Sequence, residues 1–255
     1  MKGAKQNSST RIRADKLLVD KGYFESRTQA RHSILAGNVR VGKDRVIQKS
    51  NEKWDPETLF TVTQTLPYVS RGALKLIPAL DKHAPQLHGA VALDLGASTG
   101  GFTEVLLQRG ATKVYAVDVG YGQLHYRLRT DPRVVCLEKI NARYLANAHI
   151  PESIDVLTAD LSFISLTKVL PAAHRFLKLN SWVFVLIKPQ FEALRREVRK
   201  GGVVTSASVI QRITSEICDF ADKNLGWKFI DVIASPIKGP KGNIEYVGVF
   251  RLGND

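Results

Sequence analysis

Several features are scarce or absent in this chain of 255 residues, and each absence argues against a class of protein. The two cysteines, Cys136 and Cys218, are too few for a disulfide framework or a four-cysteine zinc site. No apolar run approaches the roughly 18 residues of a membrane span, and residues 1–10 are polar, unlike a signal peptide. We find no internal repeat, no low-complexity tract and no cluster of histidine and cysteine. The sequence predicts a cytoplasmic protein that holds no metal and is not embedded in a membrane.

Acidic side chains are also few relative to basic ones. The chain has 24 Asp and Glu against 37 Lys and Arg, which gives a formal net charge of +13 and a pI of about 9.8. Such an excess favours an anionic partner, with nucleic acid first and an acidic membrane surface second. The hydrophobic content of 44% is ordinary for a globular protein, and the length allows one large domain and a small one.

The chain divides at a short linker rich in turn-forming residues. We expect a loose tail at 1–10, a small α+β domain at 11–66, a linker at 67–70 and a large domain at 71–255. In the small domain, one short helical pattern stops at Gly22, and a capping-box sequence at 26–29 opens a second helix that ends at Gly37. Strands are predicted around Val39 and Val41 and from Phe60 toward Gln64.

Basic residues outnumber acidic residues in the small domain. Residues 1–66 contain 13 Lys and Arg against 7 Asp and Glu, and Arg27 and Arg31 share a helix face because they are four apart. Such a face is either simply solvated or a phosphate-contacting surface. The run SRxxARxxIxxG at 26–37 resembles the alpha-L RNA-binding motif of a small-subunit ribosomal protein and several RNA-modifying enzymes. The RNA-binding residues predicted over the whole chain are Arg11, Arg13, Arg27, Arg31, Arg71, Arg195 and Arg196.

The pattern of the large domain predicts an α/β fold with a Rossmann-like, doubly wound sheet. A helix at 71–80 precedes strand patterns at 90–95, 113–117, 134–137, 154–159 and 182–187, with helical patterns between most of them. A helix near 208–223 and two late strands, 227–234 and 245–251, follow. The late strands predict a hairpin at one sheet edge, as in the methyltransferase variant of this fold.

The stretch at 93–103 (LDLGASTGGFT) is the most informative in the chain. It predicts a buried strand, a small-residue loop and a helix start, which together present backbone N–H groups at the end of a strand. Its spacing is neither the dinucleotide fingerprint nor a phosphate-binding P-loop. Asp118 ends the next strand, where a ribose diol would bind. A nucleoside without a pyrophosphate fits this pattern, and S-adenosylmethionine is such a ligand.

Two further strands end in charged residues that could act on a substrate. Asp160 follows the strand at 154–159, and Lys188 follows the very apolar strand at 182–187. A buried lysine needs a partner, and Asp160 is the natural one; the pair could also be a purely structural ion pair. A lysine suits a hydroxyl acceptor, because a base of lowered pKa can take its proton. Burial or a second cation would lower the pKa of Lys188, and Lys75 is the candidate for that cation.

Other acceptors fit the sequence less well. Methyl transfer to a base amino group usually uses an Asp or Asn followed by Pro-Pro and an aromatic residue, whereas residues 188–191 are KPQF. Transfer to a pyrimidine carbon needs a nucleophilic cysteine, and neither Cys136 nor Cys218 sits at a strand end that faces the crevice. A hydroxyl such as the ribose 2′-hydroxyl remains the favoured acceptor.

Five motifs spread along the chain resemble those of one family. They are 70–76 (SRGALKL), 94–103 (DLGASTGGFT), 160–166 (DLSFISL), 187–192 (IKPQFE) and 239–245 (GPKGNIE). Together they resemble the TlyA family of ribosomal RNA 2′-O-methyltransferases, historically called haemolysins, whose catalytic domain is similar to FtsJ-type methyltransferases. The match covers nearly the whole chain, including the small domain.

The resemblance implies roles for individual residues. A catalytic tetrad falls on Lys75, Asp160, Lys188 and Glu245, with Lys188 nearest to the 2′-hydroxyl. From the sequence pattern alone, Glu245 would be a solvated residue at a strand start. The cofactor site expected for S-adenosylmethionine comprises Asp94, Gly96, Ala97, Ser98, Gly100, Gly101, Phe102, Asp118, Asn141 and Asp160. The stretch 194–200 is more basic than the family pattern, and is either an RNA-binding segment or an exposed loop.

The sequence therefore predicts S-adenosylmethionine-dependent 2′-O-methylation of ribosomal RNA, with RNA or ribosomal subunits as partner and no metal. A non-catalytic ribosome-assembly factor, a membrane-active haemolysin and a small-molecule O-methyltransferase are the alternatives. The basic small domain argues against a small-molecule O-methyltransferase. The intact set of motifs argues against a non-catalytic assembly factor. The nucleotide, the subunit and the oligomeric state are left open by the sequence.

Overall fold

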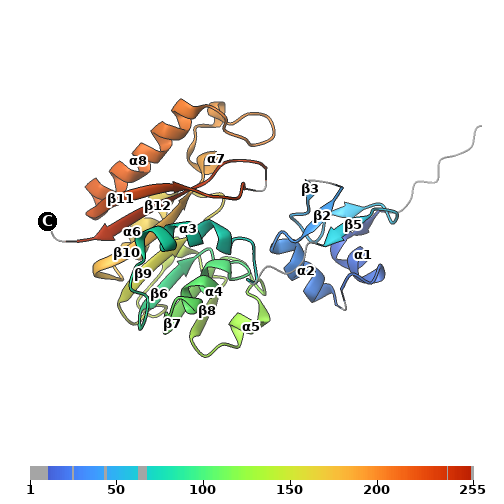
Figure 1. Ribbon diagram of the computed structural model, residues 1–255, viewed down its shortest axis with the longest axis horizontal. Helices are drawn as coiled ribbons and strands as arrows, with labels where there is room; N and C mark the ends of the chain where they lie inside the picture. Colours follow the sequence, from blue (N-terminus) through green and yellow to red (C-terminus); the bar gives the residue numbers. More distant parts are fainter. Residues whose placement is uncertain (1–10, 25, 43–44, 63–67, 240, 254–255) are drawn as a thin grey trace, which may run out of the picture. The chain divides into compact units, whose positions relative to one another are not determined.

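The computed structural model describes residues 11–24, 26–42, 45–62, 68–239 and 241–253. By its contacts the chain forms two units, Met1–Arg71 and Gly72–Asp255 (Figure 1). The predicted tail at 1–10, the strand position Gln64 and linker residue Pro67 lie outside the described residues. Arg71, which the sequence analysis placed at the start of the large domain, is the last residue of the first unit: its backbone N–H donates to the Ala36 carbonyl at 3.4 Å, and its side chain lies against Gly37.

Short elements build the first unit. Its helices are α1 (Ala14–Asp20) and α2 (Arg27–Leu35), and its strands are β1 (Ile12–Arg13), β2 (Val39–Val41), β3 (Arg45–Val46), β4 (Lys53–Trp54) and β5 (Phe60–Val62). Strand β2 pairs antiparallel with β3 and β5, and β1 pairs with β4. Apolar residues of both helices and of β2 and β5 form a small core that includes Leu18, Ile34 and Phe60.

The ends of α2 follow the sequence signals. The Ser26 hydroxyl accepts a hydrogen bond from the backbone N–H of Gln29 at 3.2 Å, as an N-cap does. At the other end, Gly37 has φ of +76°, and the N–H groups of Gly37 and Asn38 return to the last turn. The helix is therefore fixed at both ends, with the predicted phosphate-contacting residues Arg27 and Arg31 on it.

The second unit is built on one seven-stranded sheet. Its strands are β6 (Val91–Leu95), β7 (Lys113–Asp118), β8 (Val134–Glu138), β9 (Ile154–Ala159), β10 (Leu177–Ile187), β11 (Trp227–Ala234) and β12 (Tyr246–Leu252). They lie in the order β11-β12-β10-β9-β6-β7-β8. Strand β12 is antiparallel to β10 and β11, and the remaining pairs are parallel. The Rossmann-like sheet with a late hairpin at one edge is confirmed.

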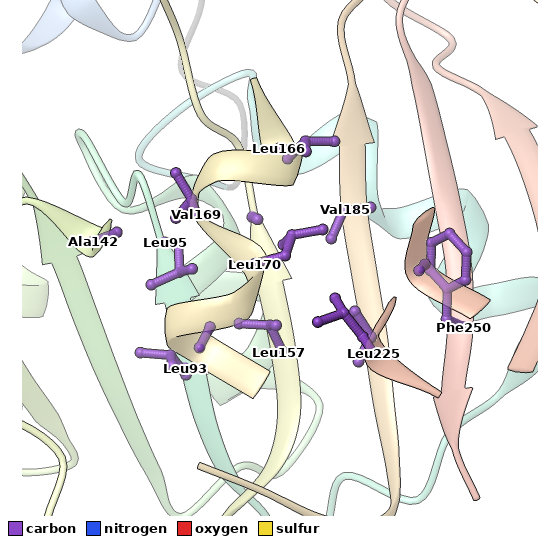
Figure 2. Packing of buried hydrophobic residues seen from close by; sticks show 14 of the residues in the cluster. Leu93, Leu95, Ala142, Leu157, Leu166, Val169, Leu170, Val185, Leu225 and Phe250 are labelled. Carbon is purple, nitrogen blue, oxygen red and sulfur yellow. The ribbon is translucent and has the colours of Figure 1, made fainter. Parts of the chain in front are cut away.

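Helices cover both faces of this sheet. They are α3 (Ala73–His83), α4 (Gly101–Gln108), α5 (Tyr126–Arg129), α6 (Leu170–His174), α7 (Pro189–Glu192) and α8 (Ala207–Leu225), with short 3-10 turns at Ala142–Tyr144, Leu166–Lys168 and Arg195–Glu197. Alternate residues of a strand point to opposite faces. Leu93 and Leu95 accordingly join the core beneath α6 and α8 (Figure 2), whereas Asp94 points to the opposite face, where it bonds to Thr103 of α4.

The topology brings the ends of three parallel strands together. From β6 the chain moves outward through β7 to β8, then returns to β9 and β10 on the other side of β6. Ligands of open α/β sheets bind where the strand order reverses in this way, beyond the carboxyl ends of the strands. Here the loops after β6, β9 and β10 carry the predicted motifs. Within the described residues, no helix has both the length and the apolar character to cross a membrane.

Candidate active site

A cavity of about 450 Å³ lies beyond the carboxyl ends of β6, β7 and β9. Its volume is within the usual range of small-ligand pockets, roughly 300–1,000 Å³. Of the predicted cofactor-binding residues, it is lined by Gly96, Ser98, Asp118, Asn141 and Asp160. The lining also includes residues of the loop after β9, among them Ser162 and Phe163, which the sequence analysis did not assign to the cofactor site.

The loop after β6 is held close to the neighbouring strands. Gly96 has φ of +80°, and a Cβ on it would collide with the backbone carbonyl of Asp160. Ser98 also has a positive φ, +48°, and its backbone N–H donates to a carboxylate oxygen of Asp118 at 2.8 Å. The second oxygen of Asp118 accepts from Gly120 N–H at 2.7 Å. Asp118 thus joins the loop after β6 to the loop after β7, and it also lines the cavity.

Five predicted cofactor-binding residues are outside the cavity lining and support the loop instead: Asp94, Ala97, Gly100, Gly101 and Phe102. Asp94 is fully buried, and its carboxylate accepts from the hydroxyls of Thr103 at 2.6 Å and Thr158 at 2.9 Å. It thereby connects β6, α4 and β9. Gly100 has no room for a Cβ, because the side chains of Leu124 and Leu128 pack against it.

A carboxylate that the sequence analysis missed organises the other wall of the cavity. Glu138, at the end of β8, accepts backbone N–H groups from Gly122 at 2.8 Å and Gln123 at 2.9 Å, and it pairs with Arg129. Burial alone would raise the pKa of this carboxyl, but these donors outweigh it and lower the pKa to about 2. Gln123 lines the cavity, so Glu138 shapes the cavity without lining it.

Lys188 and Asp160 meet beside the cavity, as the sequence analysis expects from their strand ends. Lys188 Nζ lies 2.5 Å from Asp160 Oδ1 and donates to Ser162 Oγ at 2.9 Å. The Lys188 residue is only 6% exposed, and its ammonium also lies 5.7 Å from the ring centroid of Phe191, within cation–π range. Pro189 ends the strand and begins α7, which directs Lys188 toward the loop after β9.

Lys75 and Glu245 complete a four-residue cluster with this pair. Lys75 Nζ lies 2.8 Å from Glu245 Oε2 and 3.4 Å from Asp160 Oδ2. The other oxygen of Glu245 accepts from Gln190 Nε2 at 3.0 Å, and Gly239 leaves room for this carboxylate by having no Cβ. Glu245 is 1% exposed, so the solvated position suggested by its sequence pattern alone is wrong.

The charges of the cluster compensate one another. Burial works against a charged Asp160, yet Lys188 and Lys75 outweigh it and lower its pKa to about 2. Burial likewise opposes the charge on Lys75, but Asp160 and Glu245 outweigh it and raise its pKa. Asp160 is therefore a carboxylate and Lys75 an ammonium throughout the physiological pH range.

Neither cysteine takes part in this site. Cys136 lies within β8 and Cys218 within α8. Burial raises the pKa of the Cys136 thiol, and it raises the pKa of Cys218 to about 11. Both thiols stay protonated at neutral pH, which agrees with the argument against transfer to a pyrimidine carbon.

The predicted RNA-binding arginines lie in both units. In the first unit, Arg13 and Arg27 both pair with the buried carboxylate of Asp15, at 2.9 and 3.0 Å, while Arg11 and Arg31 are exposed. Burial works against the charge of Asp15, but the two arginines lower its pKa to about 2. In the second unit, Arg195 and Arg196 are exposed on the 3-10 turn after α7. Arg71, the last residue of the first unit, is partly buried, and its side chain lies against Gly37.

Two family models match this chain. Residues 68–252 match the FtsJ-like methyltransferase model, and residues 12–50 match the S4 domain model. A solved S-adenosylmethionine-dependent methyltransferase from Listeria monocytogenes shares the fold, with a TM-score of 0.54 at 18% identity over 72% of this chain and all of that one. The fold and the site therefore define an FtsJ-like methyltransferase that carries an S4 domain.

Similar proteins identify the family to which the chain belongs within this class of methyltransferases. The chain is 46% identical to the 16S/23S rRNA (cytidine-2′-O)-methyltransferase TlyA of Mycobacterium tuberculosis, over 96% of this chain and 91% of the relative. It is 42% identical to Hemolysin A of Brachyspira hyodysenteriae, over 94% and 100%. A Streptococcus thermophilus protein named as a hemolysin superposes with a TM-score of 0.74 at 37% identity, over 97% and 90%. The chain belongs to the TlyA family.

Proposed function

We propose that this protein transfers a methyl group from S-adenosylmethionine to a ribose 2′-hydroxyl of ribosomal RNA. The observation that carries the proposal is the cluster of Lys188, Asp160, Lys75 and Glu245 beside a cavity of ligand size. The name of the Mycobacterium tuberculosis relative supports cytidine as the modified nucleotide and both ribosomal subunits as substrates.

The residues that line the cavity fit S-adenosylmethionine. The carboxylate of Asp118 suits a ribose diol, and Gly96, which has no side chain, would leave room in the cavity for the amino-acid moiety. Asn141 also lines the cavity and would contact the adenine. When bound, S-adenosylmethionine supplies an electrophilic methyl group on a sulfonium, and Asp160 would place its negative charge near it.

Lys188 would act on the acceptor hydroxyl. A ribose 2′-hydroxyl is a weak nucleophile at neutral pH, so a base must remove its proton as the new O–C bond forms. Lys188, in its uncharged form, would take that proton onto Nζ. Lys75 would remain cationic beside Asp160 and compensate the carboxylate charge while Lys188 is neutral. Glu245 would hold Lys75 in that position, and the cluster would align the ribose for in-line attack.

The S4 domain would supply affinity and orientation through phosphate contacts. Its exposed basic side chains, Arg27 and Arg31 on α2 and Arg11 before β1, are the donors we propose for this role. Binding by such contacts weakens steeply as salt rises, because released counterions are the driving force. RNA affinity that does not change between about 50 and 200 mM salt would contradict this part of the proposal.

The name of the Brachyspira hyodysenteriae relative favours one other candidate, a membrane-active protein. Leakage of a dye from liposomes that contain anionic lipid would test it directly. Our proposal predicts no leakage at concentrations at which methyl transfer is complete.

The experiment for the main proposal is transfer of labelled methyl from S-adenosylmethionine to separated, unmodified large and small ribosomal subunits. Resistance of the labelled linkage to alkaline cleavage identifies 2′-O-methylation, because cleavage needs the free hydroxyl. We expect label on a ribose of at least one subunit. No label on either subunit, with S-adenosylmethionine shown to bind, would favour the non-catalytic assembly factor.

A further inference from the structure

Two loops of the second unit form one basic surface next to the cluster. Loop A, residues 194–204, joins α7 to α8 and carries Arg195, Arg196, Arg199 and Lys200, all exposed. Loop B, of which the structure describes residues 235–239 and 241–245, joins β11 to β12, carries the exposed Lys238 and Lys241, and ends at Glu245. By sequence the only acidic residue of loop A is Glu197, and loop B has none before Glu245.

The one acidic side chain of loop A is already occupied within the protein. Glu197 pairs with Arg212 of α8 at 2.7 Å, and it also accepts the backbone N–H of Leu194 at 2.9 Å. It therefore fixes the start of loop A and leaves the positive charge of the loop uncompensated. A dense set of exposed cations with so little acid nearby fits a polyanion.

Asn243 joins the two loops from inside. This residue is 2% exposed, its Oδ1 accepts from the backbone N–H of Val204 at 3.0 Å, and its Nδ2 donates to the carbonyl of Gly202 at 2.9 Å. A buried side-chain amide that satisfies backbone groups of another segment fixes that segment strongly, because breaking either bond leaves a buried polar group unpaired.

The tip of loop A is packed against loop B as well. Residues 199–203 form a tight turn in which Arg199 and Val203 pair as an isolated bridge. Gly202 has φ of +82°, and the Lys241 side chain lies against it so closely that a Cβ would have to displace it. Lys200 and Lys241 therefore belong to one surface although they are 41 positions apart in the sequence.

Loop B also connects this surface to the proposed catalytic cluster. Asn243 precedes Glu245 by two residues, and the N–H of Ser235 closes the base of the loop on the Glu245 carbonyl at 2.8 Å. A displacement of loop A would thus be transmitted through Asn243 to the backbone that positions Glu245.

We propose that loops A and B together bind the sugar-phosphate backbone of the substrate RNA, and that Asn243 is a positioning residue that holds this surface in register with Glu245. The inference rests on the proposed function and adds to it a second RNA-binding surface, in the methyltransferase unit itself. The bound phosphates would fix the RNA strand relative to the cluster that acts on the ribose.

The first test uses the full-length protein and unmodified ribosomal subunits, and compares two double variants. Lys200→Gln with Lys241→Gln removes two cations of the surface. Lys223→Gln with Lys228→Gln removes two exposed cations near the start of β11, at the opposite end of this strand from loop B. We expect the first pair alone to reduce the slope of log affinity against log salt by nearly 2 and to raise KM on the order of tenfold, with little change in kcat. Equal salt slopes for the two double variants would contradict the proposal that loops A and B bind phosphates of the RNA.

The second test addresses Asn243. Because Asn243→Ala breaks both bonds between the loops, we expect it to raise KM and lower kcat together, whereas the lysine pair changes KM alone. Asn243→Asp keeps the acceptor for Val204 and should recover part of the loss. Unchanged kcat in Asn243→Ala would overturn the positioning role; if this variant does not fold, as judged by melting temperature and S-adenosylmethionine binding, Asn243→Asp provides the same comparison. The salt slope is a binding measurement, so it tests the surface even if no methyl transfer is found.

Discussion

Asp94 within β6 and Asp160 directly after the neighbouring strand β9 are two carboxylates whose surroundings give them opposite properties. Among the described residues, the side-chain partners of Asp94 are the neutral hydroxyls of Thr103 and Thr158, and burial raises its pKa to about 6. Asp160 contacts two lysine ammonium groups, which overcome the effect of burial and lower its pKa to about 2. The comparison teaches that the cations, more than burial, set the charge state in this site.

The two carboxylates should therefore affect stability in opposite directions as pH changes. The folded protein holds the Asp94 proton more tightly than the unfolded chain, so this group lowers the free energy of unfolding as pH rises from about 4 to about 6. Asp160 holds its proton less tightly when folded. Its contribution is present above about pH 4 and is lost as pH falls toward 2.

The largest effect is expected when the cations lose their shared carboxylate. Asp160→Asn leaves the buried Lys75 with Glu245 as its acidic partner in the cluster and removes the carboxylate with which Lys188 pairs. Breaking a buried ion pair costs about 3–5 kcal/mol, and transfer should fall by at least a thousandfold. Denaturant unfolding and single-turnover rates measure the two effects. A variant as stable as the wild type at pH 7 would show that the cluster does not depend on this charge.

A smaller loss is expected at the far end of the cluster. Glu245→Gln keeps the shape of the side chain but removes the negative charge from Lys75. We expect kcat to fall on the order of ten- to a hundredfold, because Lys75 is then less firmly held, while S-adenosylmethionine affinity stays the same. Isothermal titration of the cofactor beside a steady-state assay separates the two. A selective loss of cofactor affinity would move Glu245 out of the proposed role.

Loop organisation is expected to affect binding more than chemistry. Glu138→Gln weakens the acceptor for the N–H groups of Gly122 and Gln123. The cavity wall to which Gln123 belongs is then held less firmly in place. S-adenosylmethionine affinity should fall roughly tenfold, which is the size expected for the loss of a charge-assisted hydrogen bond. Glu152→Gln, at a carboxylate that pairs with Lys113 outside the cavity lining, is the matched control. Equal affinities for the two variants would argue against this role.

The last expected effect, on stability, sharpens the comparison between the two carboxylates. Asp94→Asn removes a carboxyl that ionises at about pH 6 in the folded state. The variant should lack the decline in stability between pH 4 and 6, which is on the order of 2 kcal/mol for a pKa raised this far. Urea denaturation at several pH values measures it. An unchanged pH profile would mean that Asp94 is not the group responsible.

Much of the fold was accessible from sequence because its signals are local. The strand patterns at 154–159 and 227–234 match β9 and β11 to the residue. The start of β10 was missed: the sequence predicts 182–187, whereas the strand begins at Leu177. Its first half contains exposed polar residues and Asn180 with φ of +66°, so the apolar pattern that marks a buried strand is absent there.

The site was only partly predictable, for a physical reason. The partnership of Lys188 with Asp160 follows from topology, because adjacent parallel strands end side by side. The burial of Glu245 does not, since its partners Gln190 and Lys75 come from two segments distant in sequence. Glu138 was missed likewise, because a carboxylate that binds backbone N–H groups leaves no pattern in sequence. One available signal was that, like Asp118, it ends a predicted buried strand.

The most direct test of the account is the rate of a single methyl transfer by Lys188→Ala, at saturating S-adenosylmethionine and ribosomal subunits, beside the cofactor affinity of the same variant. The account assigns the proton transfer to Lys188 and cofactor binding to the cavity beyond β6. It therefore predicts a loss in rate on the order of a thousandfold, with the dissociation constant of S-adenosylmethionine within about twofold of wild type. A near wild-type rate, or weak cofactor binding with chemistry intact, would contradict it.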